Sequence, residues 1–401
     1  MLSTFLTAGG RKGKLDFDEL GIQEVVEVLN AEETDLNSVL RDFGNRGRGE
    51  DPVIHFYEDF LREYDKKLKV QRGVFYTPQP VVSYIVRSVH ELLQTEFGLE
   101  DGLASTATWG EMVERVKGLQ IPAGTKASDP FVVVLDPATG TATFLVEVID
   151  LIHKTMKAKW KKEGHLPLQI PKLWNEYVPK QLLPRLHGHE LMMAPYAIAH
   201  MKIGLKLAET GYRFSTEERA RIYLTNALEP WVKQLPLIGF DVLAHEAAAV
   251  NEIKRHKRFT VVIGNPPYSI SSANTGEWIQ RLVQTYKNGL NEINVNSLSD
   301  DYVKFLRFSE HVVSSTCMGI IGMITNNSYV DGTIHRVMRA SLLRSFRKLF
   351  FLDLHGSAKV FNKAGEHGKD ENVFDIQQGV AIALLVCPPA PASSIETKHL
   401  S

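Results

Sequence analysis

The residues best suited to chemistry are Asn265-Pro266-Pro267-Tyr268, which follow a short apolar run, FTVVIG, at positions 259–264. Two successive prolines each fix φ and supply no N–H, so they form a rigid loop whose carbonyl groups point in set directions. The side-chain oxygen of Asn265 and the backbone carbonyl of Pro266 can then converge as two acceptors on one NH₂ group. Tyr268 adds a flat face on which a base can stack, a contact worth about 1–3 kcal/mol.

This arrangement suits methylation of an exocyclic amine. The lone pair of adenine N6 is delocalised into the ring, which makes this nitrogen a poor nucleophile. Two acceptors on its hydrogens favour a more tetrahedral nitrogen, whose lone pair can attack a sulfonium methyl group. The alternative interpretation is a proline-stiffened loop with a structural role only.

A second candidate loop, DPATGTATF, begins at Asp136 at the end of the run FVVVLD. Gly140 suits close approach of a ligand to backbone N–H groups ahead of a helix. The loop is neither G-x-x-x-x-G-K-[ST], because no lysine follows, nor G-x-G-x-x-G, because position 142 is alanine. Considered alone, it can also be an ordinary strand-to-helix turn.

Two polar residues follow the next candidate strands. Glu190 is placed to accept hydrogen bonds from the ribose hydroxyls of a nucleoside cofactor, although an acid near a helix N-terminus is favourable in any protein. Asn226 offers one acceptor and one donor to an adenine edge, and its alternative role is that of a turn residue.

The elements that must position these residues are short apolar runs separated by helical stretches. This alternation predicts an α/β fold, a doubly wound, mostly parallel seven-stranded sheet covered on both faces. Ligands of such sheets bind outside the carboxyl ends of the strands. The last two runs have no helix between them and are expected to pair as a hairpin. The expected strands are 131–136, 185–190, 221–225, 259–264, 319–325, 348–354 and 380–386.

The remaining stretches divide the chain further. Residues from about 20 to 70 alternate apolar and charged positions at helical spacing, and residues 1–70 are expected to form a helical N-terminal or coupling segment. Residues 71–390 are expected to form the core. Residues 391–401 are expected to form a tail, because the end of the chain, CPPAPASSIETKHLS, is rich in Pro and Ser. We expect residues 97–130, 160–184 and 269–300 to be insertions or long loops.

Composition excludes several classes of protein. The chain has 401 residues and a net charge of −1, so no global basic field attracts nucleic acid. Cys317 and Cys387 lie in apolar contexts, which favours a reducing, cytoplasmic location. No Cys/His cluster has zinc-ligand spacing, so no metal site is predicted. Without an apolar signal region or a run near 18 apolar residues, neither secretion nor membrane insertion is expected.

The motifs together resemble a known family. Asn265–Tyr268 matches the N-P-P-Y motif of S-adenosylmethionine-dependent amino-methyltransferases, and DPATGTATF resembles their D-P-A-x-G-S-G-x-F loop. GVFYTPQPVV, at 73–82, resembles the segment preceding that loop in N6-adenine DNA methyltransferases of the gamma arrangement. The sequence around these motifs is most similar to the methyltransferase region of type ISP restriction-modification enzymes. These are long polypeptides that also carry nuclease, helicase-like ATPase and target-recognition domains.

This resemblance implies a class I methyltransferase fold and S-adenosylmethionine as the cofactor. It implies a site-specific DNA adenine-N6 methyltransferase core of a restriction-modification system, which acts on an adenine flipped out of double-stranded DNA. Phe374 would be a second aromatic face against that base, or else a core phenylalanine. The other residues implied are Tyr76, Thr77 and Pro78 at the methionine end of the cofactor, Asp136, Ala138 and Gly140 at its backbone, Glu190 at the ribose, Asn226 at the adenine, and the catalytic Asn265, Pro266, Pro267 and Tyr268.

Two departures from the family keep alternatives open. Ala142 replaces the usual second glycine of the loop, and if this position requires positive φ it should weaken cofactor binding by about 1 kcal/mol or more. The short tail leads us to expect that a target-recognition domain is absent and that it lies elsewhere, with any nuclease and ATPase domains. The alternatives are a catalytically weak scaffold or DNA-binding subunit, a protein-glutamine or RNA base N-methyltransferase, and an NAD-dependent dehydrogenase.

Overall fold

The computed structural model describes residues 77–214, 218–231, 241–269, 272–292, 294–316, 318–355, 378–389 and 396–400. The chain divides into two compact units, residues 1–65 with 232–251 and residues 66–231 with 252–401. Within the first unit the described residues are 241–251, which form the beginning of helix α11 (Asp241–His256). The predicted helical segment at 1–70 lies outside the described residues.

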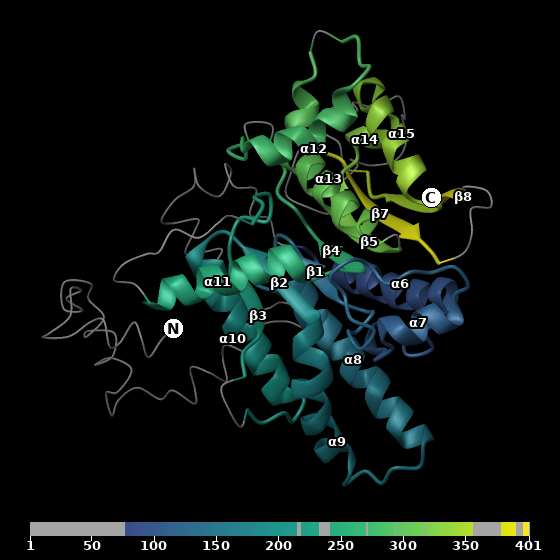
Figure 1. The fold of residues 1–401 in the computed structure, drawn as a ribbon, viewed down its shortest axis with the longest axis vertical. Helices are drawn as coiled ribbons and strands as arrows, with labels where there is room; N and C mark the ends of the chain where they lie inside the picture. The colour runs from purple at the N-terminus through teal and green to yellow at the C-terminus, as the bar shows by residue number, and fades with distance from the viewer. Residues whose placement is uncertain are drawn as a thin grey trace, which may run out of the picture. The chain divides into compact units, whose positions relative to one another are not determined.

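An eight-stranded sheet forms the centre of the larger unit (Figure 1). Its strands follow the spatial order β3-β2-β1-β4-β5-β7-β6-β8. Their bounds are β1 Val134–Asp136, β2 Leu186–Glu190, β3 Arg221–Leu224, β4 Val261–Gly264, β5 Gly319–Asn326, β6 Lys348–Asp353, β7 Val380–Cys387 and β8 Glu396–Leu400.

The predicted mostly parallel sheet is confirmed. Strands β1 to β5 run parallel to one another, whereas β7 is antiparallel to both β5 and β6. The hairpin expected from the last two apolar runs is therefore present, with Lys348 opposite Val386. Strand β8, which pairs with β6 in parallel, was not predicted and lies in the segment expected to be a tail.

Helices cover the sheet and also occupy the stretches predicted as long loops. The expectation of long loops at 97–130, 160–184 and 269–300 is wrong for parts of these stretches, which contain α7, α9 and α12 respectively. The remaining α-helices bear out the helical stretches between strands. The bounds are α6 Gln79–Phe97, α7 Trp109–Arg115, α8 Thr143–Lys162, α9 Ile170–Tyr177, α10 Met193–Glu209, α12 Glu277–Lys287, α13 Asp301–Ser314, α14 Ser328–Asp331 and α15 Arg336–Ser345.

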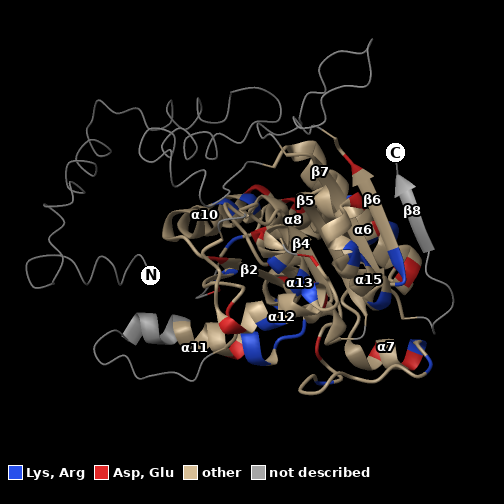
Figure 2. Ribbon diagram, turned by 90° about the horizontal axis from the view of Figure 1, so that it is seen from above, with Lys and Arg blue, Asp and Glu red and all other residues tan. Residues whose placement is uncertain are grey.

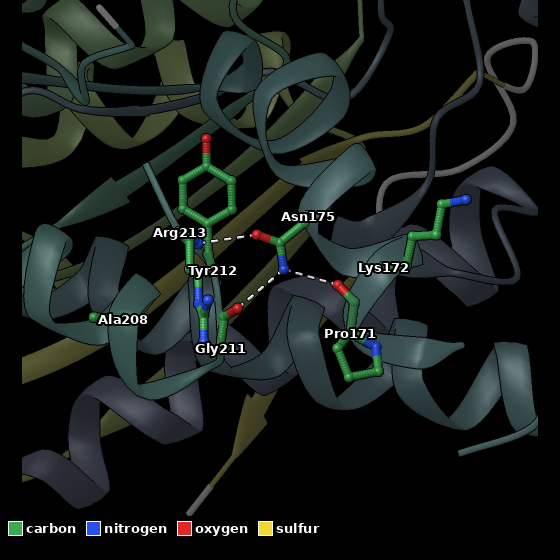
Figure 3. A pocket seen from close by; sticks show the side chains of 7 residues that line it. All are labelled: Pro171, Lys172, Asn175, Ala208, Gly211, Tyr212 and Arg213. Atoms are coloured by element: carbon green, nitrogen blue, oxygen red, sulfur yellow. Dashed lines mark hydrogen bonds between the residues drawn. The ribbon is translucent and has the colours of Figure 1, made fainter. Parts of the chain in front are cut away.

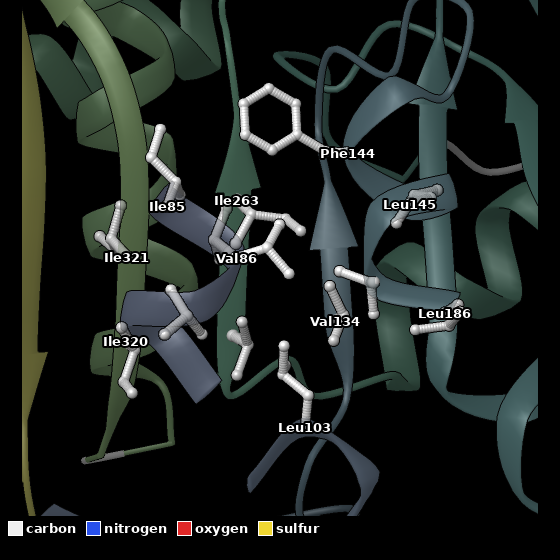
Figure 4. Packing of buried hydrophobic residues seen from close by; sticks show 14 of the residues in the cluster. Ile85, Val86, Leu103, Val134, Phe144, Leu145, Leu186, Ile263, Ile320 and Ile321 are labelled. Atoms are coloured by element: carbon white, nitrogen blue, oxygen red, sulfur yellow. The ribbon is translucent and has the colours of Figure 1, made fainter. Parts of the chain in front are cut away.

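Both faces of the sheet are buried, because successive residues at β1 belong alternately to two different apolar clusters. Val134 belongs to the main apolar cluster with residues of α6 and α8 (Figure 4). Its neighbours Val133 and Leu135 belong to a second cluster with residues of α12 and α13. Because successive strand residues point to opposite faces, the sheet is packed between two helical layers, which is the doubly wound arrangement predicted from the sequence.

Helix α6 approaches the sheet closely at Gly322 of β5. A Cβ built on Gly322 would lie 2.8 Å from Val89 Cγ2 and 3.0 Å from Ile85 Cγ2, both on α6. Pro78 precedes the helix with φ −55° and ψ 136°, which turns the chain immediately before the first helical residue. The close contact with β5 thus holds α6 on the sheet, and Thr77 lies two residues before the start of this helix.

Charged side chains are mixed over the fold. Lysine and arginine positions (blue) and aspartate and glutamate positions (red) are both scattered over the described ribbon in Figure 2, in keeping with the net charge of −1. Across the described residues, no helix is both long and apolar enough to cross a membrane.

Candidate active site

The candidate residues lie at one edge of the sheet because their strands are parallel. Strand β1 ends at Asp136, β2 at Glu190 and β4 at Gly264, which immediately precedes Asn265. Strand β3 ends two residues before Asn226. Carboxyl ends of neighbouring parallel strands meet at the same edge. The structure therefore brings the loops of all four predicted positions to that edge.

Asp136 is a buried carboxyl group with one unpaired oxygen. Its Oδ1 accepts a hydrogen bond from the Ala138 N–H at 3.1 Å, and its backbone oxygen accepts one from Thr139 Oγ1 at 2.9 Å. No partner reaches Oδ2 among the described residues. Burial, with a smaller contribution from Glu190, raises the pKa of Asp136 to about 8. A cation placed against Oδ2 would compensate this desolvation.

The turn after β1 contains two residues in the left-handed region, Gly140 with φ 54° and Ala142 with φ 65°. Nothing lies within 4 Å of a Cβ built on Gly140, so its surface is open to a ligand. Ala142 is fully buried and belongs to the main apolar cluster. Position 142 therefore has the positive φ that the sequence analysis considered, and the alanine methyl packs in the core.

Glu190 joins the turn after β1 to the end of β2. Its Oε2 accepts a hydrogen bond from Gly140 N at 2.9 Å, and its Oε1 accepts one from Met192 N at 2.7 Å. Glu190 thus holds the turn after β1 against the end of β2, and its predicted role at the ribose stays a prediction.

Asn226 forms a turn of its own and reaches across to the loop after β4. Its Oδ1 accepts from Leu228 N at 3.0 Å, as in an Asx turn. Its Nδ2 donates to Asn274 Oδ1 at 3.0 Å and to Glu229 Oε1 at 3.2 Å. The turn role considered from the sequence is therefore present, together with a contact to Asn274 that the sequence did not predict.

The Asn265 amide is held between two hydroxyl groups. Its Nδ2 donates to Thr77 Oγ1 at 2.9 Å, and its Oδ1 accepts from the Tyr268 hydroxyl at 3.0 Å. Thr77 and Asn265 are 188 residues apart in sequence. The start of α6 and the N-P-P-Y loop therefore meet at the site.

The Tyr268 ring is buried among aromatic side chains. It is 7% exposed and meets Tyr302 edge-on, with ring centroids 6.2 Å apart. Tyr302 in turn lies 6.0 Å from the Tyr329 ring. Burial raises the Tyr268 pKa well above its usual value, so the hydroxyl keeps its proton for the bond to Asn265.

Two residues of α13 that sequence reasoning missed anchor the loop after Tyr268. Asp301 at the start of α13 accepts from Asn274 Nδ2 at 2.9 Å, and Lys304 Nζ donates to Ser272 Oγ at 2.5 Å. The signal available was the acidic doublet Asp300-Asp301 opening a helix after a polar run. Tyr76 and Phe374 lie outside the described residues, so their predicted roles stay predictions.

A hollow of about 690 Å³ lies elsewhere, between α9 and the end of α10 (Figure 3). Asn175 crosses it, donating to the backbone oxygens of Pro171 and Gly211. Residues 211–213 precede β3, so the hollow is at the opposite, amino edge of the sheet. Over the described part of the chain, no three His, Cys, Asp or Glu side chains are grouped to hold a metal ion.

Comparison with known proteins shows which family and which solved structures this chain is similar to. Residues 188–361 match the Eco57I restriction-modification methylase family. A solved structure of the ATP-dependent Type ISP restriction-modification enzyme LlaBIII bound to DNA is 26% identical with a TM-score of 0.67, covering 87% of this chain and 21% of that one. No curated protein was found to be similar.

Two further structures are similar in fold. They are a DrdV–DNA complex, 24% identical with a TM-score of 0.63 over 88% of this chain and 30% of that one, and a nuclease-deletion mutant of the Type ISP enzyme LlaGI with a DNA substrate mimic. The latter is 23% identical with a TM-score of 0.61 over 95% of this chain and 32% of that one. This chain thus spans a fifth to a third of the enzymes it matches. The predicted resemblance to a restriction-modification methyltransferase region is confirmed.

Proposed function

We propose that this chain is the DNA adenine-N6 methyltransferase core of a restriction-modification system, with S-adenosylmethionine as the methyl donor. The observation that carries the proposal is the 2.9 Å hydrogen bond between Asn265 Nδ2 and Thr77 Oγ1. It joins the loop suited to grip an amine to the segment expected to close over the reactive end of the cofactor. The two motifs therefore form one site.

The residues present fit the cofactor. When bound, S-adenosylmethionine supplies an electrophilic methyl group on a sulfonium. Asp136 Oδ2, buried and unpaired among the described residues, suits the cationic methionine end. Gly140 gives open access to the turn, and Glu190, which ends β2 beside that turn, is proposed to accept hydrogen bonds from the ribose. Thr77, Pro78 and Ala138 would complete the pocket, and Tyr76 is proposed to do so as well.

The residues after β4 would grip the target base. Asn265 Oδ1 and the Pro266 carbonyl would accept the two hydrogens of the adenine N6 amine. Pro267 would keep that carbonyl fixed, because its ring locks φ. The Tyr268 hydroxyl holds the Asn265 oxygen at 3.0 Å, and we propose that its ring, with Phe374, stacks on the flipped base.

Duplex DNA is the proposed substrate because the similar structures of LlaBIII and DrdV are complexes with DNA. This chain covers 21% and 30% of those proteins. We propose that target recognition, and any nuclease or ATPase activity, belongs to domains outside this chain. The net charge of −1 agrees with this, since tight DNA binding normally requires many cationic phosphate contacts.

The test combines methyl transfer with identification of the product. The purified chain is incubated with duplex DNA and S-adenosylmethionine carrying a deuterated methyl group, and the digested nucleosides are separated by mass spectrometry. We expect deuterated N6-methyladenine from the natural chain and none from Asn265→Ala. Tyr268→Phe, which keeps the ring and removes the hydroxyl, should give a reduced rate. Label in cytosine, or label from Asn265→Ala equal to that from the natural chain, would contradict the proposal.

A further inference from the structure

We propose that Asn274 and Asp301 are positioning residues that orient the Asn226 amide, so that its oxygen faces the adenine amine of the cofactor. This inference rests on the proposed function, since it concerns the nucleoside end of the same site. It explains how an asparagine serves at a position where an aspartate is more frequent in the resembled family. Asn274 and Asp301 come from the loop after the catalytic motif and from the first turn of α13.

The partners of Asn226 fix the orientation of its amide. Leu228 N can only donate, so the atom facing it at 3.0 Å must be the side-chain oxygen. The Glu229 carboxylate can only accept, so the atom facing it at 3.2 Å must be the nitrogen. The second hydrogen of that nitrogen goes to Asn274 Oδ1 at 3.0 Å. Both amide hydrogens are used, and the oxygen keeps one lone pair.

The orientation of Asn274 is fixed by the same logic. Its Nδ2 donates to Asp301 Oδ1 at 2.9 Å, and a carboxylate at this place accepts only. The Asn274 oxygen is thereby turned toward Asn226. Its backbone N–H donates to Ser272 Oγ at 3.0 Å, which holds the main chain of the loop as well.

Asp301 is itself anchored on the protein. It is 6% exposed and lies in the first turn of α13, where the helix N-terminus favours a negative charge. The Ser272 hydroxyl donates to Asp301 Oδ1, and the Lys304 ammonium lies 3.8 Å from the same oxygen. Lys304 is 1% exposed and also donates to Ser272. Directional hydrogen bonds therefore run without interruption from Asp301 to Asn226.

This chain of bonds has a chemical consequence for ligand choice. An adenine presents an NH₂ donor at its 6-position, whereas hypoxanthine presents a carbonyl acceptor there. An aspartate accepts from adenine in either rotation, but an asparagine does so only if its oxygen faces the ligand. With Asn274 in place, the site selects adenine. Without it, the Asn226 amide is held only by Leu228 N–H and by the exposed Glu229 carboxylate at 3.2 Å. It can then turn over more readily and present its nitrogen to the hypoxanthine carbonyl.

The experiment is calorimetric titration of the full chain with S-adenosylhomocysteine and with S-inosylhomocysteine, which carries hypoxanthine in place of adenine. We expect the natural chain to bind the adenine ligand at least about tenfold more tightly, because a missing hydrogen bond at a buried polar site is strongly disfavoured. In Asn274→Leu, similar in size but unable to accept, this ratio should fall below about threefold. The exposed residue Asn288 supplies the matched control, Asn288→Leu, in which the ratio should be unchanged.

A rescue separates positioning from a general structural role. The double variant Asn226→Asp with Asn274→Leu restores an acceptor that needs no orientation, so the preference for adenine should return. An unchanged ratio in Asn274→Leu, or a lost preference without rescue, would overturn the inference. If the natural chain binds both ligands equally, the inference fails while cofactor binding stands. If it binds neither, the proposed function fails as well.

Discussion

Replacing Ala142 by glycine tests whether the backbone strain in the turn after β1 reduces the stability of the fold or the affinity for the cofactor. Ala142 has φ 65° and is fully buried within the main apolar cluster. A left-handed conformation costs an L-residue about 1–2 kcal/mol relative to glycine. Against this gain, the substitution removes a buried methyl group worth about 0.8 kcal/mol. Glycine also adds about 0.4–1 kcal/mol of conformational freedom to the unfolded chain.

These contributions nearly cancel. We therefore expect Ala142→Gly to change the free energy of unfolding by less than about 1 kcal/mol, which urea unfolding monitored by circular dichroism would measure. The matched control is Gly140→Ala, at φ 54°, where an added Cβ meets nothing within 4 Å. That variant acquires the strain with no packing gain, so it should be destabilised.

The same comparison applies to ligand affinity. Because the core already holds Ala142 at positive φ, the strain belongs to folding and not to binding. Calorimetry should give S-adenosylmethionine affinities for Ala142→Gly and the natural chain within about threefold of each other. A tenfold or greater increase with glycine would refute this reasoning, since it would mean that the turn must rearrange when the cofactor binds.

Three further predictions concern the same edge of the sheet. Gly264→Ala should lower the free energy of unfolding by about 1–3 kcal/mol in urea titration, because its Cβ would lie 2.8 Å from Asp136 Oδ1. The Asp136 pKa is raised to about 8 from 3.8, so the folded protein retains a proton that the unfolded chain releases. Stability should therefore fall as pH rises between these values, by up to about 1.4 kcal/mol per pH unit, and Asp136→Asn should remove this component when unfolding is measured across pH 5–8. Thr77→Val should lower kcat about tenfold by releasing the Asn265 amide while Thr77→Ser restores it, and an unaltered kcat in Thr77→Val would show that the bond at 2.9 Å is dispensable.

The sequence predicted the sheet well because its signal is local. Each buried strand is a short apolar run, and the residue after a strand can be counted along the chain; Asp136, Glu190 and Asn265 therefore fall where they were expected. The helices α7, α9 and α12 were missed, the last two for a visible reason. Their segments contain Pro171 and a polar stretch, which resemble loops when packing against neighbouring elements is unknown.

The partners of the site residues were beyond prediction for a different reason. The Thr77 hydroxyl meets the Asn265 amide across 188 residues, and Asn274 meets Asn226 across 48. No periodicity in the sequence encodes such pairs, because they depend on how α6 and the loop after β4 approach the sheet edge. Strand β8 is similarly non-local, since it pairs with β6 across a gap in sequence.

The two site asparagines have a common design under the proposed function. In each, the amide nitrogen donates hydrogen bonds to the protein. Asn265 donates to Thr77, and Asn226 donates to Asn274 and Glu229. In each, the oxygen has one protein donor and retains a lone pair. The cofactor adenine and the target adenine both present an exocyclic NH₂ group, so both ends of the reaction require an oriented acceptor. Loss of orientation should have different effects at the two positions. At Asn226 it should alter which nucleoside binds, whereas at Asn265 it should slow the methyl transfer itself, since only that amine is the nucleophile.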